Sequence, residues 1–176
     1  VVFPKRKKPY HKPQQQQPIR KLDGPEDVLK RDTIIVSCGM LNFEAGAYAN
    51  GSSRAFRDYQ GTRKVATSHF EKFPEARVKF INSFRRNYPD LVKGRHVIVV
   101  DCTSFHDPGH DKELRGHTGM HHETMKAITE SAEFIPVNKP LQGLRKDKKN
   151  LVINVCKSGR HRSVGNTEAQ FDAIRN

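Results

Sequence analysis

The sequence contains no tryptophan and only three cysteines in 176 residues, and aromatic residues make up 8% of it. The thiols, Cys38, Cys102 and Cys156, each lie at the end of an expected strand, which does not suit the disulfide framework of a small secreted protein. We therefore expect reduced thiols in an intracellular, reducing compartment, either the cytoplasm or an organelle. The sequence also lacks a signal-peptide core and an apolar run long enough to cross a bilayer, so we expect no membrane partner.

Acidic residues are scarce, since 19 Asp and Glu stand against 32 Lys and Arg and the net charge is +13. An excess of this size favours a nucleic acid as partner over a purely solubilising role. The first 22 residues contain no acid, four prolines and the run Gln14–Gln17, and cannot bury enough apolar surface to fold alone. They form either a disordered tail or an extended basic arm along RNA phosphates, and we favour the arm. Its expected RNA-binding residues are Lys5, Arg6, Lys7, Lys8, Lys12, Arg20 and Lys21.

The remainder, residues 23–176, is expected to be one α/β domain with a small, mostly parallel sheet flanked by helices. Three β-branched runs predict its strands, namely Thr33–Cys38, His96–Val100 and Leu151–Val155. Amphipathic patterns predict helices over Thr62–Tyr88 with a break at Pro74, over Met120 to about Phe134, and over Ser163–Ile174.

The loop Cys156–Arg162 joins the last strand to the last helix and concentrates phosphate-binding chemistry. A helix N-terminus contributes unpaired N–H groups and partial positive charge, and Gly159 lets the backbone approach a ligand closely. The residues expected to hold a phosphate are Lys157, Ser158, Gly159, Arg160, His161, Arg162 and Ser163.

Three interpretations of this loop remain open. The spacing from Cys156 to Arg162-Ser163 matches the Cys-x5-Arg-Ser/Thr pattern of cysteine-dependent phosphatases. Such an enzyme would use Cys156 as nucleophile, Arg162 to grip the phosphate and Asp107 as general acid. Alternatively, the loop binds a phosphate without cleaving it, which we favour, or Cys156 is a small buried residue and the cations are merely solvated.

The loop also resembles the C-terminal domain of the RNase adapter protein family RapZ, in which a strand leads into Gly-Cys-x-Gly-Gly-x-His-Arg-Ser-Val. The matching residues are Cys156, Gly159, His161, Arg162, Ser163 and Val164, whereas Val155 and Ser158 replace glycines. Two further blocks match in order, Ile35–Gly39 and Asp101–Gly119. In the second block Asp101, Pro108, Leu114, Arg115, Thr118 and Gly119 match, and Thr103, His106 and Asp107 depart from the family's Arg, Pro and Asn.

The resemblance covers Thr33–Gly39 and Val97–Ile174, with an insert at about 40–94. It implies a domain that binds structured RNA and senses an amino-sugar phosphate. The family's nucleotide-binding N-terminal domain has no counterpart, because no Gly-x4-Gly-Lys-Ser/Thr motif is present, and the chain, which starts without Met, is expected to be processed or partial.

The carboxyl ends of parallel strands share one edge, where ligands bind. We therefore expect Gly39, Asp101, Arg115, Thr118 and Gly119 to form one pocket with the Cys156–Arg162 loop. Histidines are frequent between Phe105 and His122, but the glycines and Pro108 indicate loop rather than a helical metal site, so we expect no metal.

The segment Pro136–Asn150 is expected to be a basic loop, either a solvated connector or a second RNA-binding patch with Arg145, Lys146, Lys148 and Lys149. Taken together, these patterns predict a non-catalytic RNA- and phosphate-binding module inside a larger ribonucleoprotein. It would have RNA and other proteins as partners, and no cofactor beyond a bound phosphate or phosphosugar. The alternatives are a cysteine-dependent phosphatase and a structural subunit that kept the fold and lost the ligand.

Overall fold

The computed structural model describes residues 29–40, 43 and 68–175, so the expected arm and residues 41–42 and 44–67 of the insert lie outside the described residues. In this part of the chain β1 (Thr33–Gly39), β2 (Arg95–Asp101) and β3 (Lys149–Cys156) form one parallel sheet in the order β1-β3-β2. Gly39 pairs with Cys156 and Asp101 with Val155, so the three strands end at the same edge. The structure thereby confirms the α/β class and the small parallel sheet.

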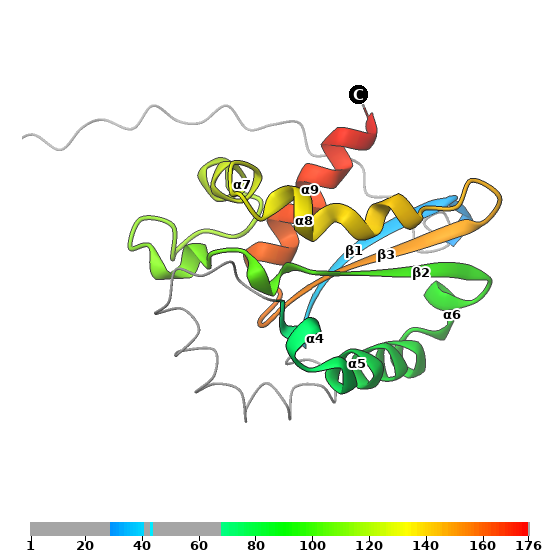
Figure 1. Ribbon diagram of the computed structural model, residues 1–176. Helices are drawn as coiled ribbons and strands as arrows, with labels where there is room; N and C mark the ends of the chain where they lie inside the picture. Colours follow the sequence, from blue (N-terminus) through cyan, green and yellow to red (C-terminus); the bar gives the residue numbers. More distant parts are fainter. Residues whose placement is uncertain (1–28, 41–42, 44–67, 176) are drawn as a thin grey trace, which may run out of the picture.

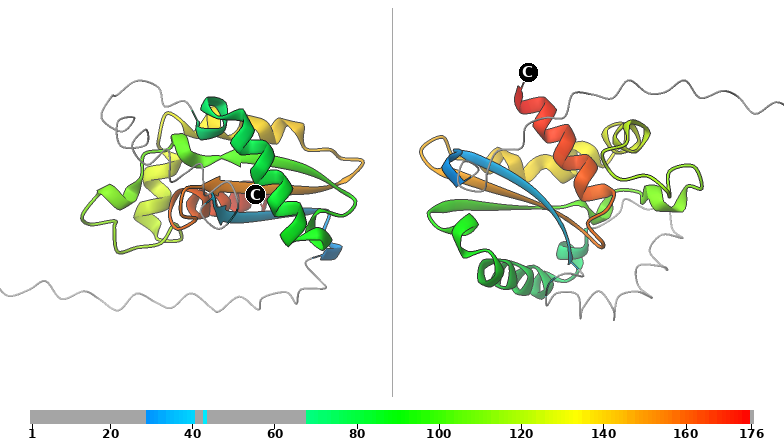
Figure 2. Two further views of the ribbon diagram at one scale, coloured as in Figure 1. Left: turned by 90° about the horizontal axis from the view of Figure 1, so that it is seen from below. Right: turned by 180° about the vertical axis from the view of Figure 1, so that it is seen from behind.

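Helices cover both faces of the sheet (Figures 1 and 2). The helices α4 (His69–Lys72), α5 (Pro74–Asn87) and α6 (Pro89–Val92) lie on one face. The helices α7 (His122–Thr129), α8 (Phe134–Asn138) and α9 (Arg162–Arg175) lie on the other.

The central strand β3 separates two hydrophobic cores because its side chains alternate between the faces. Leu151, Ile153 and Val155 pack with the buried rings of α5, and Val152 and Cys156 pack into the core that lies toward α7 and α8. Because both faces are covered, every residue of β3 from Asn150 to Cys156 is buried, and five of these seven are apolar.

Helix α5 has the amphipathic pattern that the sequence predicts. Ala76, Phe80 and Phe84 are buried at four-residue spacing, and Pro74 occupies the first turn, where a missing N–H costs no helical hydrogen bond. The expected break at Pro74 is confirmed by Phe73, which separates α4 from α5.

Two predicted elements on the other face are partly wrong. The helix expected from Met120 to about Phe134 is confirmed only over His122–Thr129 (α7), because residues 130–133 interrupt it before α8 begins at Phe134. The expected loop Pro136–Asn150 is partly helical, because α8 continues to Asn138 and the 3-10 helix η4 spans Lys139–Gly143. The prolines at 136 and 140 do not interrupt these helices, since each stands in the first turn of its own short element, where proline is tolerated.

A buried network of amide side chains joins β3, α8 and α9, and sequence analysis did not anticipate it. Asn154 Nδ2 donates to Gln170 Oε1 at 2.7 Å, and Asn154 Oδ1 accepts from Asn166 Nδ2 at 2.9 Å. Asn138 and Asn166 exchange hydrogen bonds at 2.9 and 3.1 Å. Because each amide finds partners, the network can lie at a helix–sheet interface that apolar residues would otherwise fill.

Candidate functional site

The loop that joins β3 to α9, residues 157–161 (the β3–α9 loop), lies against the end of β1 at the carboxyl edge of the sheet. Gly159 has a φ of +73°, a conformation that glycine adopts without strain. A Cβ added to Gly159 would lie 2.5 Å from Gly39 N, and one added to Gly39 would lie 2.5 Å from the carbonyl carbon of Ser158. The two glycines therefore allow a close contact between the loop and β1 that no side chain could accommodate unchanged.

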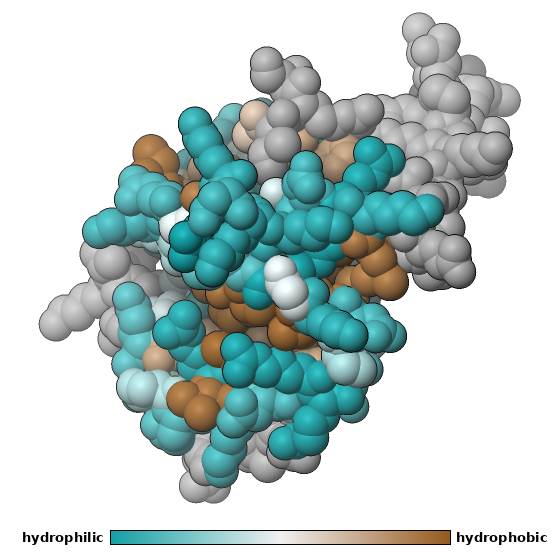
Figure 3. Space-filling view, turned by 90° about the vertical axis from the view of Figure 1, so that its right-hand side faces the viewer, coloured by the Kyte–Doolittle hydropathy of each residue, from teal (hydrophilic) through white to brown (hydrophobic). Residues whose placement is uncertain are grey.

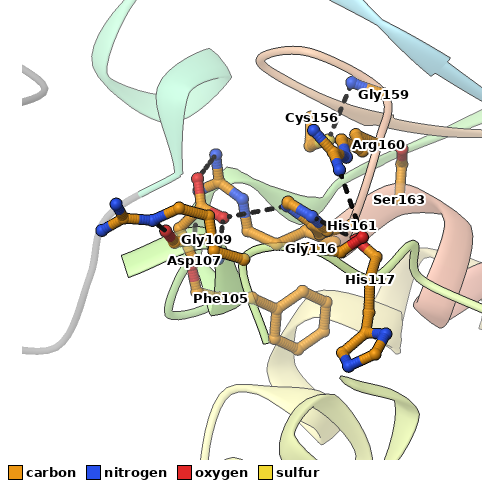
Figure 4. A network of polar contacts seen from close by, with 12 residues as sticks. Phe105, Asp107, Gly109, Gly116, His117, Cys156, Gly159, Arg160, His161 and Ser163 are labelled. Carbon is orange, nitrogen blue, oxygen red and sulfur yellow. Dashed lines mark hydrogen bonds and ion pairs between the residues drawn. The ribbon is translucent and has the colours of Figure 1, made fainter. Parts of the chain in front are cut away.

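Cys156 lies at the base of this loop and is 1% exposed. Its Sγ accepts a hydrogen bond from Gly159 N at 3.2 Å and lies 3.3 Å from Ser163 Oγ (Figure 4). Donors directed at sulfur would stabilise a thiolate, which is the form that a nucleophilic cysteine needs. This contact set is the strongest structural feature in favour of the phosphatase interpretation.

Arg162 is 3% exposed, and its guanidinium binds groups of the chain itself. Its Nη1 donates to the carbonyl oxygens of Thr103 at 2.9 Å and Phe105 at 3.3 Å, and its Nη2 lies 3.4 Å from Asp107 Oδ2. The side chain therefore ties the first turn of α9 to the segment that follows β2. The guanidinium that the sequence predicts to bind a phosphate is therefore already bound by groups of the chain itself.

Asp107 connects Arg162 to His161. His161 Nδ1 lies 3.5 Å from Asp107 Oδ1, and His161 Nε2 lies 2.8 Å from the carbonyl oxygen of His117 (Figure 4). Burial alone would raise the pKa of Asp107, but Arg162, the N–H of Gly109 and His161 outweigh it and lower that pKa. At neutral pH the group is thus a carboxylate without a proton to give, which opposes its predicted role as general acid.

Asp101 stands at the predicted edge, but its carboxylate faces α4. Its Oδ2 accepts from Phe70 N at 2.7 Å, and its Oδ1 accepts from Thr103 N at 2.9 Å and Thr103 Oγ1 at 2.6 Å. Thr103 Oγ1 in turn accepts from His69 N at 2.8 Å. Asp101 and Thr103 together satisfy the first N–H groups of α4, a role that the sequence did not reveal.

Of the three other predicted pocket residues, Gly119 contacts the β3–α9 loop directly. Gly119 donates its N–H to Arg160 O at 3.0 Å and leaves no room for a Cβ against the backbone of α9. Thr118 is exposed. Arg115 is also exposed, and its Nε donates to Gly109 O at 3.0 Å.

Arg160 is exposed as well, and its Nη2 makes a long contact of 3.5 Å with Gly116 O (Figure 4). Arg115 and Arg160 are therefore both held by carbonyl oxygens of the stretch 109–116. Their charges reach solvent at the carboxyl edge, unlike the charge of Arg162.

Two cavities flank the sheet. The smaller, of about 350 Å³, lies at the end of β1 and has Ser158 and Gly159 of the β3–α9 loop in its lining. The larger, of about 700 Å³, follows the outer edge of β2 between α4–α5 and α8–η4, and the β3–α9 loop does not line it. Only the smaller of these two cavities therefore adjoins the predicted phosphate-binding loop.

The basic residues Arg145, Lys146, Lys148 and Lys149 lie at the opposite end of the sheet, where β2 and β3 begin. Figure 3 views this end and shows mainly hydrophilic residues on both sides of a hollow with hydrophobic surface. Arg145 forms a two-point contact with Asp147 at 2.8 and 3.1 Å, and the three lysines are exposed. The structure thus separates the predicted RNA-binding loop from the predicted phosphate-binding loop by the length of the sheet.

The described chain also begins at this end, because Arg95 donates to Leu29 O at 2.6 Å and Lys149 Nζ to Lys30 O at 3.4 Å. The predicted arm residues precede this point in the sequence and lie outside the described residues.

In the histidine-rich stretch, the rings of His117 and His121 stack at 3.6 Å. Within residues 29–40, 43 and 68–175, no group of three or more His, Cys, Asp or Glu could hold a metal ion, and no helix is long and apolar enough to span a membrane.

Comparison of the chain with family models, curated proteins and solved structures finds no significant match. The resemblance to the RapZ C-terminal domain therefore rests on the three sequence blocks alone.

Proposed function

We propose that this chain is a non-catalytic module that binds phosphorylated ligands and RNA, and that it works inside a ribonucleoprotein in a reducing compartment. The observation that carries the proposal is the exposed guanidinium of Arg160 in a glycine-containing loop that leads into a 14-residue helix, with Arg115 exposed on the segment 109–116 that Arg160 contacts.

The phosphate half of the proposal rests on geometry at the carboxyl edge. The first N–H groups of α9 have no partner within the helix and attract anions. Arg115 is already held by a backbone carbonyl, so it would lose less conformational freedom on binding than a mobile side chain. We assign the side-chain contacts to Arg115 and Arg160 rather than to Arg162, which already binds two carbonyl oxygens and Asp107. The resemblance implies that the ligand is an amino-sugar phosphate.

The RNA half of the proposal rests on charge at the opposite end of the sheet. Lys146, Lys148 and Lys149 are exposed there, and the chain leading from the basic arm enters the described fold at the same end. Cations that neutralise phosphates release counterions, so RNA binding should weaken linearly on a plot of log affinity against log salt. Together, the arm and the loop would form one RNA-binding surface.

Calorimetry with inorganic phosphate and glucosamine 6-phosphate tests the phosphate half. Arg160→Gln should lower the affinity about tenfold or more, since a charge-assisted hydrogen bond contributes about 1.5–3 kcal/mol. Lys126→Gln is the matched control, because it removes the same charge from an exposed position on α7. Equal losses in both variants would contradict a site at the β3–α9 loop.

Filter binding of RNA across a salt series tests the RNA half. Replacing Lys146, Lys148 and Lys149 by Gln should flatten the log–log slope by about 0.7–0.9 for each phosphate that is no longer neutralised. Removal of residues 1–21 should flatten it further. The control replaces Arg77, Lys112 and Lys126, which are exposed elsewhere, and should leave the slope nearly unchanged. Equal slopes in the two triple variants would exclude the loop from the RNA-binding surface.

A cysteine-dependent phosphatase is the second candidate, favoured by the contacts of Cys156 Sγ with Gly159 N and Ser163 Oγ. Two observations oppose it. Arg162 is turned toward the segment after β2, and Asp107 is held as a carboxylate beside that arginine. Both groups would have to be released before they could take the roles that hydrolysis requires.

A further inference from the structure

The cavity of about 350 Å³ lies where the connections of the sheet diverge. The chain leaves β1 toward α4–α6 on one face, and it leaves β3 toward α9 on the other (Figures 1 and 2). In open α/β sheets, neighbouring strands whose connections run to opposite faces leave a crevice outside their carboxyl ends, and ligands bind in it. The lining of the cavity includes Cys38 and Gly39 of β1, Ser158 and Gly159 of the β3–α9 loop, and Phe84, Tyr88 and Leu91 from α5 to α6, so the cavity lies next to this crevice, on its α5–α6 side.

One wall of the cavity is aromatic. Phe43 and Phe84 are 8% and 3% exposed and stack at a centroid distance of 5.6 Å. Tyr88 packs against Phe84 at 5.0 Å and against Phe43 at 6.3 Å, yet remains 47% exposed. Tyr88 is thus held by buried rings and still accessible to a ligand. The same cavity is lined by Ser158 and Gly159 of the loop for which we propose phosphate binding.

We propose that this cavity binds the base and ribose of a nucleoside 5′-phosphate whose phosphate lies on the β3–α9 loop, an inference that rests on the proposed function. A nucleobase is planar, and each of the bases can stack on aromatic side chains. The cavity volume falls at the lower end of the range of small-molecule sites, about 300–1,000 Å³. Ser158 of the β3–α9 loop is among the lining residues and carries a hydroxyl group that could bind the ribose.

The aromatic wall distinguishes this ligand class from a phosphosugar alone. A pyranose could pack its C–H groups on one ring, but it has no π system and covers less of the wall than a nucleobase and ribose together. The same ligand chemistry can come from a free mononucleotide or from the 5′-phosphorylated end of an RNA strand. Both present a base and a phosphate at the same separation.

Calorimetry with adenosine 5′-monophosphate, adenosine and inorganic phosphate tests the inference. We expect the monophosphate to bind at least tenfold more tightly than either of its parts. Tyr88→Ala should lower the affinity for the monophosphate about tenfold and leave the affinity for inorganic phosphate unchanged. Tyr88→Phe should keep the parent affinity for the monophosphate because the ring remains. Phe171→Ala is the matched control, since Phe171 is 41% exposed and lies outside the cavity lining.

A monophosphate that binds no more tightly than inorganic phosphate would overturn the inference while leaving the proposed phosphate site intact. An affinity reduced equally by Tyr88→Ala and Phe171→Ala would also overturn it. Absence of binding by all three probes would overturn both this inference and the phosphate half of the proposed function. Competition by short RNAs with a 5′-phosphate or a 5′-hydroxyl then separates the sources, because only the phosphorylated RNA should displace the mononucleotide if the natural ligand is an RNA end.

Discussion

Gly39 at the end of β1 and Gly159 in the β3–α9 loop lie in such close contact that neither position has room for a Cβ. The loop is thereby pressed onto the sheet edge, which places Cys156, the start of α9 and the small cavity next to one another. Two residues far apart in the sequence thus define the geometry of the site by backbone contact alone.

This contact predicts a loss of stability in Gly39→Ala. The new methyl group would meet the backbone of Ser158 and force the loop away from β1, at a cost of about 1–3 kcal/mol. Urea denaturation measures the difference. Gly116→Ala is the control, because its Cβ would have no neighbour within 4 Å and should change stability by less than about 0.5 kcal/mol. A destabilisation in Gly39→Ala no larger than in the control would contradict the observed packing.

The amide network predicts that Asn154→Leu destabilises the fold. The leucine would fill much of the space but remove the donor to Gln170 Oε1 and one acceptor each of Asn166 Nδ2 and Gln170 Nε2, which both still donate to Asn138. We expect a cost of about 1–3 kcal/mol for the unsatisfied Gln170 oxygen. The midpoint of urea unfolding should fall accordingly. Asn87→Leu provides the control, since Asn87 is exposed at the end of α5. A stable Asn154→Leu protein would show that the network adds nothing beyond packing.

The lowered pKa of Asp107 predicts that the stability of the fold depends on pH. Its pKa is lowered in the folded state, so its ionised form stabilises the fold above the unfolded pKa of about 3.9, and this contribution is lost as the pH falls through the lower folded value. Asp107→Asn should therefore be less stable than the parent at pH 7, and the difference should shrink below about pH 4. Asp111→Asn is the control, as Asp111 is exposed in the same loop. A difference that persists unchanged at pH 3 would refute the electrostatic origin.

Substitution of Cys156 distinguishes a phosphate-binding module from a phosphatase. We expect no release of phosphate from an aryl phosphate above background, because Arg162 and Asp107 are engaged with each other. Cys156→Ser should also leave RNA affinity unchanged. Burial raises the pKa of Cys102 well above its usual range, so this thiol is unreactive and Cys102→Ser serves as the control. Turnover that vanishes in Cys156→Ser and persists in Cys102→Ser would establish the phosphatase.

Several features of the site could be predicted because they depend on local patterns. The strand before Cys156, the turn at Gly159 and the helix after Arg162 follow from β-branched residues, glycine and helical spacing. The convergence of Gly39, Asp101 and Cys156 follows from parallel pairing, which the structure confirms. Two residues of the aromatic wall, Phe84 and Tyr88, had a visible signal in their four-residue spacing, but that spacing also describes an ordinary buried helix face.

The directions of side chains could not be predicted in this way. The sequence places an arginine at position 162 but does not reveal that its guanidinium binds Thr103 O, 59 residues away. The same holds for Asp101, whose carboxylate holds the start of α4 instead of facing the pocket. Both outcomes depend on which carbonyl or N–H groups a distant segment brings within hydrogen-bond distance.

The sequence by itself determined the α/β class, the strands and the identity of the loop with the highest density of phosphate-binding groups, since hydrophobic periodicity and glycine conformations act over a few neighbouring residues. The tertiary structure alone decided the strand order β1-β3-β2 and the opposite placement of the two basic regions. It also decided that Arg115 and Arg160, rather than Arg162, face solvent. These properties arise from contacts between segments far apart in the chain, where packing and hydrogen-bond satisfaction select among arrangements that the local sequence permits equally.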